Sequence, residues 1–249
     1  LISKQMIELI VDKKGKKILK VNQSVILYDD TLIHNLNDDI FNPIHWKNRQ
    51  VLPESKKGRG SVFFIDWEGR SCALKHYCRG GFLSKLIYDQ YLYAGLEETR
   101  SFKEWNLLNQ MQALNLPVPL PIAARIRRSG FIYQADLLTE VIPSVQSMGD
   151  KLRQELMTQD LWKAIGECLS RFHQHGIIHQ DLNVENIQIN PNGRVFFLDF
   201  DKTKFSKSSP QILHANLNRL RKSILKLTLS INLDFPEKDW TELVTAASF

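Results

Sequence analysis

Cysteine is scarce in this sequence, and long hydrophobic runs are missing from it. The 249 residues include 3 cysteines, which are too few and too scattered for a disulfide framework or a four-cysteine zinc site. No apolar run approaches the ~20 residues that a membrane-spanning helix needs. The apolar stretch at 7–11 is also too short for the core of a secretory signal. We therefore expect a protein of a reducing cytoplasm that is neither exported by that route nor embedded in a membrane.

Internal repeats and glycine- or serine-rich linkers are also lacking. Hydrophobic residues make up 43% and charged residues 24% of the chain, which is an ordinary globular profile. The 33 Lys and Arg residues exceed the 27 acidic residues and give a net charge of +6. Because base-readout motifs and RNA-stacking aromatic motifs are missing, we expect no nucleic-acid partner. The excess charge indicates either an anionic lipid surface as partner or a solvated face.

The hydrophobic pattern changes character along the chain. Apolar runs broken by glycine turns predict antiparallel strands at 51–56, 61–67, 71–77 and 131–143. A helical period predicts helices at 99–114 and 159–175, and a hairpin with an Asn-Pro-Asn-Gly turn follows at 186–198. The last third is helical again. This order predicts an α+β protein of two lobes, an N-terminal region with a small antiparallel lobe (1–142) and a mainly helical lobe (143–249).

A glycine pair, Gly58 and Gly60, lies between two predicted strands. Such pairs are usually tight turns, and the third glycine of the kinase nucleotide loop is missing here. A glycine hairpin between strands can nevertheless drape its N–H groups over the phosphates of ATP. Lys75 on the next strand could then reach the α- and β-phosphates. It would need an acidic partner from the following helix, for which we prefer Glu104 to Glu98.

The segment from His179 to Asn186, followed later by Asp199, carries the clearest chemical pattern. A kinase catalytic loop needs an aspartate that accepts the proton of the acceptor hydroxyl and, five residues later, an asparagine that holds magnesium. A second aspartate must follow after a short hairpin. Asp181, Asn186 and Asp199 have this order and spacing. Each alone could be a cap or a turn residue, but the set favours a kinase.

Three histidines, His173, His175 and His179, offer a rival interpretation as a zinc cluster. Gly176 interrupts the helix between the second and the third, and no cysteine or fourth histidine lies nearby. A kinase accounts for them better, because the first two end a helix and His179 begins the catalytic loop as a scaffold residue.

Adenine recognition in a kinase requires a hinge whose backbone pairs with the edge of the base. The stretch 138–143 follows a predicted strand at the boundary between the two lobes. Glu140 and Ile142 are the expected carbonyl and amide contributors. A plain strand that runs into a loop at Pro143 is the alternative.

Several stretches have the signatures of one family: FNPIHW (41–46), GRGSVFF (58–64), LKHYCRGGFLSKL (74–86), TRSFKEWNLL (99–108), LPVPLPIAAR (116–125), HQDLNVENI (179–187), LDFDK (198–202) and NLNRLRKSILK (216–226). Together they closely resemble the bacterial 3-deoxy-D-manno-octulosonic acid (Kdo) kinases, which are lipopolysaccharide-core kinases of the protein-kinase-like superfamily. The KHYxRGG and NLxRLxxS patterns are the more specific ones. Phe200-Asp201 replaces the Phe-Gly of protein kinases, and an Ala-Pro-Glu segment is missing. Both departures favour a small or lipid-linked acceptor.

The resemblance implies a bilobal kinase-like fold and transfer of the γ-phosphoryl group of ATP to the 4-hydroxyl of Kdo on a Kdo–lipid A precursor. Asp181 would orient and deprotonate the sugar hydroxyl. Asn186 and Asp199 would hold Mg²⁺, and Lys75, set by Glu104, would hold ATP. Most of the rate gain in such transfers comes from positioning and charge stabilisation.

The resemblance also implies a peripheral protein at the cytoplasmic face of the bacterial inner membrane, with no known protein partner. Asp201 would assist the metal or the acceptor, and Arg79 is the best candidate for an acceptor contact. The catalytic loop does not separate acceptors, so a heptose kinase of the lipopolysaccharide core or an aminoglycoside-type phosphotransferase is the alternative. A pseudokinase is disfavoured by the intact catalytic set.

The predicted helix at 212–229 has two different faces. Its basic face carries Arg219, Lys222 and Lys226, which could sit on anionic lipid at about 1 kcal/mol per charge. The opposite stripe predicts ordinary core packing and consists of Leu213, Leu217, Leu220, Ile224 and Leu227.

Overall fold

The computed structural model describes residues 7–11, 17–34, 36–42, 62–79, 88–205 and 210–248. The chain divides into two compact units. Unit 1 comprises residues 1–109 and 120–141, and unit 2 comprises residues 110–119 and 142–249. The predicted strand at 51–56 and the glycine pair Gly58 and Gly60 lie outside the described residues.

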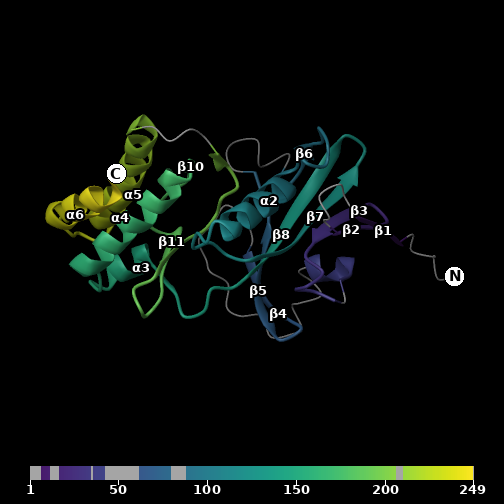
Figure 1. The fold of residues 1–249 in the computed structure, drawn as a ribbon, viewed down its shortest axis with the longest axis horizontal. Coiled ribbons are helices and arrows are strands. Elements are labelled where there is room, and N and C mark those ends of the chain that lie inside the picture. The colour runs from purple at the N-terminus through teal and green to yellow at the C-terminus, as the bar shows by residue number, and fades with distance from the viewer. Residues whose placement is uncertain are drawn as a thin grey trace. The chain divides into compact units, whose positions relative to one another are not determined.

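Unit 1 is built on an antiparallel sheet with the strand order β1-β2-β3-β7-β8-β5-β4, and a short strand, β6, pairs with β8 (Figure 1). Residues 132–133 of β8 pair with β6, and residues 136–140 pair with β5. The strands are β1 (Ile7–Val11), β2 (Lys17–Val21), β3 (Ser24–Tyr28), β4 (Val62–Trp67), β5 (Arg70–His76), β6 (Tyr91–Leu92), β7 (Pro121–Ser129) and β8 (Ile132–Glu140).

Two helical elements accompany this sheet. Helix α2 (Arg100–Ala113) lies along β7 and β8, where its first residues bond to both strands: Arg100 N donates to the Tyr133 hydroxyl at 3.1 Å and Ser101 Oγ donates to Arg125 O at 2.9 Å. A 3₁₀ turn, η1 (Asp38–Phe41), begins with an Asn37 side-chain cap. The apolar side chains of η1 join the core of the sheet because Ile40 and Phe41 are buried among residues of β3, β5, β7 and β8.

Unit 2 is mainly helical with short strand pairs. Its helices are α3 (Met148–Arg153), α4 (Gln159–Gln174), α5 (Pro210–Ser230) and α6 (Glu237–Ala247). Strands β9 (Gln146–Ser147), β11 (Ile187–Ile189) and β12 (Val195–Phe197) form a small sheet, and β10 (Ile177–Ile178) pairs with β13 (Lys204–Phe205). The end of α2 and the segment to Pro119 also belong to this unit, since Phe197 N donates to Pro117 O at 3.1 Å.

Helices α4 and α6 pack closely against each other at a glycine. A Cβ atom at Gly166 would collide with the backbone oxygen of Leu243 and lie 2.8 Å from the Cβ of Ala246. Only a residue without a side chain allows this approach. The helix α4 itself begins where the Thr158 side chain accepts a hydrogen bond from Leu161 N, and its buried face includes Ile165.

Most of the predicted elements occur where the sequence pattern placed them, and the expected α+β class with an N-terminal antiparallel sheet is confirmed. The hairpin turn closes with Gly193 at a φ of 76°, as its Asn-Gly sequence predicts. The leucine and isoleucine stripe of α5 is buried, which confirms its place in the core. Strands β1–β3 and β7 were not predicted, and the strand predicted at 131–143 ends three residues earlier.

The three cysteines are free thiols. Burial raises the pKa of the Cys72 and Cys168 thiols to about 12, so these two are inert apolar side chains rather than nucleophiles.

Candidate active site

In unit 1, Lys75 forms an ion pair with Glu104. The Nζ atom of Lys75 lies 3.1 and 2.9 Å from the two carboxylate oxygens of Glu104. The lysine comes from the end of β5 and the glutamate from the middle of α2. Glu98 instead pairs with Lys103 in solvent. Of the two acids that the sequence offered, Glu104 is therefore the one that contacts Lys75.

Tyr77 completes this arrangement. Its hydroxyl donates to Glu104 Oε2 at 2.6 Å, and its ring lies under the ammonium of Lys75, with 4.7 Å from Nζ to the ring centroid. The Glu104 side chain is only 3% exposed, so the hydrogen bond and the ion pair compensate the burial of its charge. The Lys75 side chain is 23% exposed, more than that of Glu104, and the contacts with Glu104 and Tyr77 fix its position.

In unit 2, the segment 179–186 with the kinase-type sequence pattern folds around the buried imidazole of His179. His179 Nε2 lies 2.7 Å from Leu198 O and therefore donates to it, while His179 Nδ1 accepts from Asp181 N at 3.3 Å. Both bonds together require a neutral ring with its proton on Nε2. The ring packs against Phe200 with 4.8 Å between centroids. His179 thus ties the start of the loop to the segment after β12.

Backbone bonds fix the rest of the loop. The Asn183 side-chain oxygen accepts from the amides of Glu185 at 2.9 Å and Asn186 at 3.1 Å, which closes a tight turn. The Asn186 side chain donates from Nδ2 to Asp181 O at 2.9 Å. Because the amide nitrogen of Asn186 points to the loop, its oxygen faces away from that contact. Asp181 itself is an exposed residue.

The hairpin of β11 and β12 returns the chain to Asn186. Ile187 pairs with Phe197, and Leu198 N donates to Asn186 O at 2.9 Å, so Asp199 follows directly after the residue that faces Asn186. Asp199 has a φ of 63°, a left-handed conformation that is uncommon outside glycine. Such strain is typical of functional positions. Phe200, stacked on Phe172 with 5.9 Å between ring centroids, anchors the turn.

A further set of contacts holds the loop through Glu185 and Val184. Arg153 Nη2 bonds to Glu185 Oε1 at 2.5 Å, and Ser147 Oγ donates to the other oxygen of Glu185 at 3.2 Å. A Cβ at Gly149 would lie 2.8 Å from Glu185 Oε1, so a larger residue there would push the carboxylate out of its present position. Val184 N donates to Ser223 Oγ at 3.2 Å and thereby connects the loop to α5.

The remaining predicted residues have contacts of their own. Glu140 is at the end of β8, where its carboxylate pairs with Arg70 at 3.2 Å and its N–H donates to Leu120 O. Ile142 opens the second stretch of unit 2. Arg79 is held by a bond from Nε to Gln90 O at 2.7 Å and lies over the ring of Tyr91. Arg100 lies over the same ring and also over the ring of Tyr77.

The zinc alternative is wrong for the part of the chain that the structure describes, because no group of three or more His, Cys, Asp or Glu side chains there could hold a metal ion. His173 is buried and its Nε2 lies 3.0 Å from the Asn216 amide, whereas His175 caps the end of α4. Burial lowers the pKa of His173 to about 4.

The residues Asn186 and Asp199 suit a magnesium ion. Mg²⁺ prefers oxygen ligands and in kinases takes only one or two from the protein, the rest coming from phosphates and water. One amide oxygen and one carboxylate on facing ends of a hairpin match that donor set. A cluster of three or more protein ligands is not needed for this kind of site.

Sequence reasoning missed several residues of these groups, and for two of them a signal was available. Tyr77 lies two positions after Lys75 and so on the same face of the strand, a spacing that could have shown the aromatic neighbour. Asn183 precedes Asn186 by three residues, as in an asparagine-initiated turn, and this signal was also available.

The chain has a kinase-type loop, a hairpin that is followed by an aspartate, and a strand lysine that is paired with a helix glutamate. Together these features define a kinase. The model of the lipopolysaccharide kinase (Kdo/WaaP) family matches residues 44–246, and the chain belongs to this family. The resemblance that the motifs suggested is thereby confirmed.

Individual relatives cover most of the chain. A protein of Haemophilus influenzae (strain PittEE) is 39% identical over 216 residues, which span 84% of this chain and 89% of that protein. A protein of Vibrio parahaemolyticus is 35% identical over 227 residues, with 91% and 95% covered, and one of Stenotrophomonas maltophilia is 36% identical over 218 residues, with 88% and 87% covered. All three are named 3-deoxy-D-manno-octulosonic acid kinase.

None of the helices in the described part of the chain combines the length and the apolar character that crossing a membrane would require.

Proposed function

We propose that this chain is a Kdo kinase, which transfers the γ-phosphoryl group of ATP to the 4-hydroxyl of Kdo on a Kdo–lipid A precursor in lipopolysaccharide core biosynthesis. Family membership and the names of the relatives support the proposal. The observation that carries it is the loop of unit 2, in which the Asn186 side chain bonds to the backbone of Asp181 and the hairpin returns Asp199 to Asn186.

In this proposal the chain has a bilobal protein-kinase-like fold, with the N-terminal lobe at 1–142 and the C-terminal lobe at 143–249. These lobes correspond to units 1 and 2, except that residues 110–119 and Ile142 belong to unit 2. The sheet with its α2 helix and the Lys75–Glu104 pair has the composition of a nucleotide-holding lobe. The helical unit with the catalytic loop has the composition of the lobe that carries the chemistry. The glycines Gly58 and Gly60 would cover the phosphates of ATP.

Asp181 is the proposed catalytic base. Its backbone is held by His179 on one side and by the Asn186 side chain on the other, so the carboxylate emerges from a fixed position. As the sugar oxygen forms its bond to the γ-phosphorus, Asp181 accepts the hydroxyl proton. The bond between the γ-phosphorus and the bridging oxygen breaks, and its electron pair leaves with ADP.

The other proposed site residues bind and orient. Lys75, fixed by Glu104, would bind the α- and β-phosphates, and the backbone of Glu140 and Ile142 would pair with adenine. Asn186 and Asp199 would hold Mg²⁺, which supplies charge neutralisation at the phosphate oxygens when bound. A fixed lysine matters because electrostatic stabilisation is strongest when its groups need no reorganisation.

We further propose that the protein acts as a peripheral protein at the cytoplasmic face of the inner membrane. The acceptor is lipid-linked and anionic, and α5 presents the exposed basic side chains of Arg219, Lys222 and Lys226. Each such charge near an anionic lipid surface contributes about 1 kcal/mol.

The test is phosphoryl transfer from Mg-ATP to Kdo–lipid IVA, beside a heptose-bearing core and an aminoglycoside. Transfer to the Kdo acceptor is expected, and Asp181→Ala should reduce kcat at least about a hundredfold while ATP binding persists. Asp234→Ala, which changes an exposed aspartate elsewhere in unit 2, is the matched control. If the phosphoryl group is transferred only to the heptose-bearing core, heptose and not Kdo is the acceptor. Full turnover by Asp181→Ala would overturn the assignment of Asp181 as the base.

A further inference from the structure

The end of the sheet where β6 joins the β7–β8 hairpin exposes large apolar side chains. Phe131 in the hairpin turn is 85% exposed, Leu92 in β6 is 77% exposed and Tyr88 before β6 is 53% exposed. Tyr93 N donates to Phe131 O at 2.9 Å, and Leu92 pairs with Ile132. Leu92 is therefore opposite Ile132 and Phe131 is opposite Tyr93, at consecutive levels near the tip of the hairpin. Large apolar side chains exposed together at one end of a sheet mark an interaction surface.

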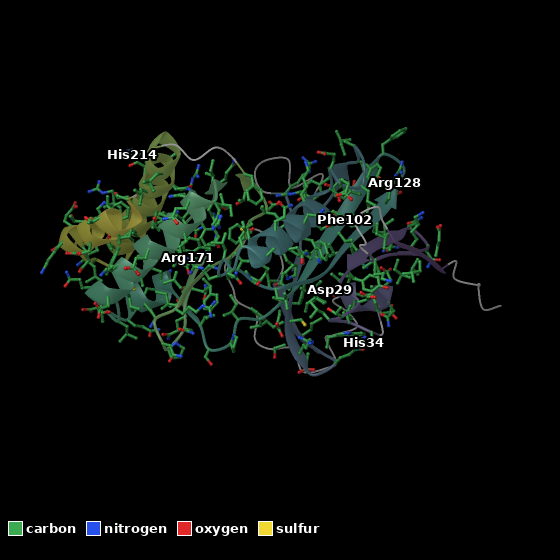
Figure 2. The ribbon with its side chains drawn as sticks, viewed as in Figure 1. Asp29, His34, Phe102, Arg128, Arg171 and His214 are labelled. Atoms are coloured by element: carbon green, nitrogen blue, oxygen red, sulfur yellow. The ribbon has the colours of Figure 1, made fainter. Side chains whose placement is uncertain are left out.

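Arginines lie beside these apolar groups. Arg127 and Arg128 are the last basic residues of β7, and both are exposed. Arg128 Nε donates to Gly130 O at 2.9 Å, and its guanidinium lies 4.2 Å from the centroid of the Tyr93 ring. Figure 2 shows Arg128 at the hairpin end of the strand. The nearby carboxylate of Asp89 is occupied by His76 and the Gln134 amide, so the exposed charge here is positive.

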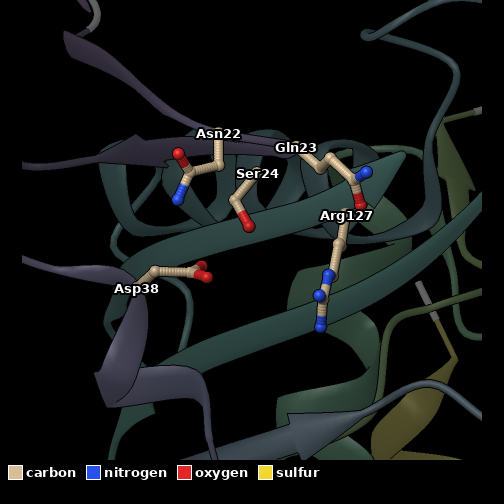
Figure 3. A pocket seen from close by; sticks show the side chains of 5 residues that line it. All are labelled: Asn22, Gln23, Ser24, Asp38 and Arg127. Carbon is tan, nitrogen blue, oxygen red and sulfur yellow. The ribbon is translucent and has the colours of Figure 1, made fainter. Parts of the chain in front are cut away.

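A polar pocket adjoins the same arginines. It has a volume of about 240 Å³, and Figure 3 shows its lining of Asn22, Gln23, Ser24, Asp38 and Arg127. Ser24 pairs directly with Arg127 across β3 and β7, and Gln23 O accepts from Arg128 N. The Asp38 carboxylate is bound to Arg125 at 3.0 Å, which balances its charge. The pocket thus places amide and hydroxyl groups next to a guanidinium, a suitable lining for a polar headgroup.

We propose that this hairpin surface, defined by Leu92, Arg127, Arg128 and Phe131, docks onto an anionic lipid surface. Phe131 and Leu92 enter the boundary between headgroups and acyl chains, and the two guanidinium groups bind lipid phosphates. The inference rests on the proposed function, because a kinase of a lipid-linked acceptor must work at such a surface. It assigns to unit 1 a membrane contact that the basic face of α5 alone does not provide.

The composition of the surface favours lipid over protein. A stable protein interface buries roughly 800 Å² on each partner, whereas a few apolar anchors with basic neighbours suffice for reversible binding to a bilayer. Tyr88 and Tyr93 add the amphipathic aromatic rings that concentrate at membrane interfaces. On α5 the exposed apolar residues Leu225 and Leu229 have charged neighbours but no aromatic residue beside them in sequence.

The experiment measures sedimentation of the full chain with phosphatidylethanolamine vesicles, with and without phosphatidylglycerol. Phe131→Ser with Leu92→Ser should weaken partitioning at least about tenfold. Arg127→Gln with Arg128→Gln should weaken it about thirtyfold on the anionic vesicles, with little change on neutral ones. Added salt should reduce only the charge-dependent part. Phe131→Trp, which keeps an interfacial aromatic residue, should bind like the unchanged protein.

A matched set of variants on α5 tests whether vesicle binding depends on the hairpin surface or on α5. Lys222→Gln, Lys226→Gln and Leu229→Ser change exposed residues of similar kind in unit 2. If these variants lose vesicle binding while the hairpin variants keep it, the hairpin assignment is overturned. It is also overturned if the protein forms a concentration-dependent dimer without lipid that Phe131→Ser abolishes, since a second copy would then cover the surface. Thermal melting verifies that each variant is folded.

A soluble acceptor separates this inference from the proposed function. With deacylated Kdo acceptor the hairpin variants should turn over at the unchanged rate, whereas with acceptor embedded in vesicles they should be slower by the factor lost in binding. Turnover of the soluble acceptor without any vesicle binding by the unchanged protein overturns the docking surface alone. Vesicle binding without turnover of either acceptor overturns the proposed function and leaves the docking surface standing.

Discussion

The buried carboxylates of unit 1, Glu104 and Asp136, are paired with basic side chains, whereas the buried polar side chains that the structure describes in unit 2 are serine, threonine, asparagine and histidine. In unit 1, Arg125 lies between Asp38 and Asp136 at 3.0 and 2.7 Å, and His76 lies between Asp136 and Asp89 at 2.7 and 3.1 Å. These side chains connect η1, β7, β8 and β5, and they include His76, the residue next to Lys75.

The corresponding interior of unit 2 contains aromatic rings and neutral imidazoles. His179 bonds to Leu198 O and to Asp181 N while it packs on Phe200, and His173 meets the amide of Asn216. A network of buried charges is strongly destabilised when one member is removed, because an uncompensated charge remains. A neutral one tolerates single losses better but is damaged by protonation. The two units should therefore break under different challenges.

The largest effect is expected from breaking the charge network of unit 1. Arg125→Met leaves Asp136, which is 2% exposed, without its guanidinium and should lower the free energy of unfolding by about 3–5 kcal/mol. Urea denaturation measures this change. Removal of both charges in Arg125→Met/Asp136→Leu should restore a large part of the lost stability, because the buried carboxylate is gone and only the partly exposed Asp38 loses its partner.

Arg127→Met, two residues along the same strand but exposed, provides the control and should change the free energy of unfolding by less than about 0.5 kcal/mol. Equal effects of Arg125→Met and Arg127→Met would show that the charge network contributes nothing beyond a surface pair.

The next effect is a pH dependence with opposite sign in the two units. Burial lowers the pKa of His173 to about 4, so between pH 6.5 and 4 the unfolded chain takes up the proton first. Unit 2 should therefore lose stability as the pH falls through this window, by about 3 kcal/mol in all. His173→Gln, which does not titrate, should flatten the dependence in denaturant titrations at several pH values.

His76 should behave in the reverse manner. Its hydrogen bond to Asp136 is the main cause that raises its pKa, so its contribution to stability is complete below pH 6.5 and is lost as the pH rises through the folded value. His76→Gln should remove this loss at higher pH and leave the acid limb unchanged. An acid limb that survives in His173→Gln would contradict the assignment to unit 2.

The same contrast explains how much of the molecule the sequence could predict. Unit 2 follows local rules: α4 has its Thr158 cap and its apolar stripe, and the hairpin has Gly193 at the turn. The spacing of Asp181, Asn186 and Asp199 was legible because the loop and hairpin between them are short. The family resemblance built on these motifs was correct.

Unit 1 depends on long-range pairing, which a local pattern does not reveal. Strand β7 was missed because Arg125 interrupts its apolar run, and the reason for that arginine, Asp136, lies on the next strand. Strand β3 pairs with β7 about a hundred residues later, so its register is not legible from its own sequence. The sequence left two candidates for the partner of Lys75, because only the packing of α2 on the sheet orients Glu104 inward.

The smallest expected effect concerns the link between the catalytic loop and α5. Ser223→Ala leaves the N–H of Val184 without its hydroxyl acceptor at 3.2 Å and should reduce the free energy of unfolding by about 1 kcal/mol. Ser230→Ala on the same helix removes a hydroxyl that bonds only to the helix backbone, and it serves as the control. If a neutral backbone network tolerates single losses, kcat should fall no more than about tenfold in Ser223→Ala. A loss of unfolding free energy comparable to that of Arg125→Met would show that unit 2 is as sensitive to single changes as unit 1 and that charge is not what distinguishes them.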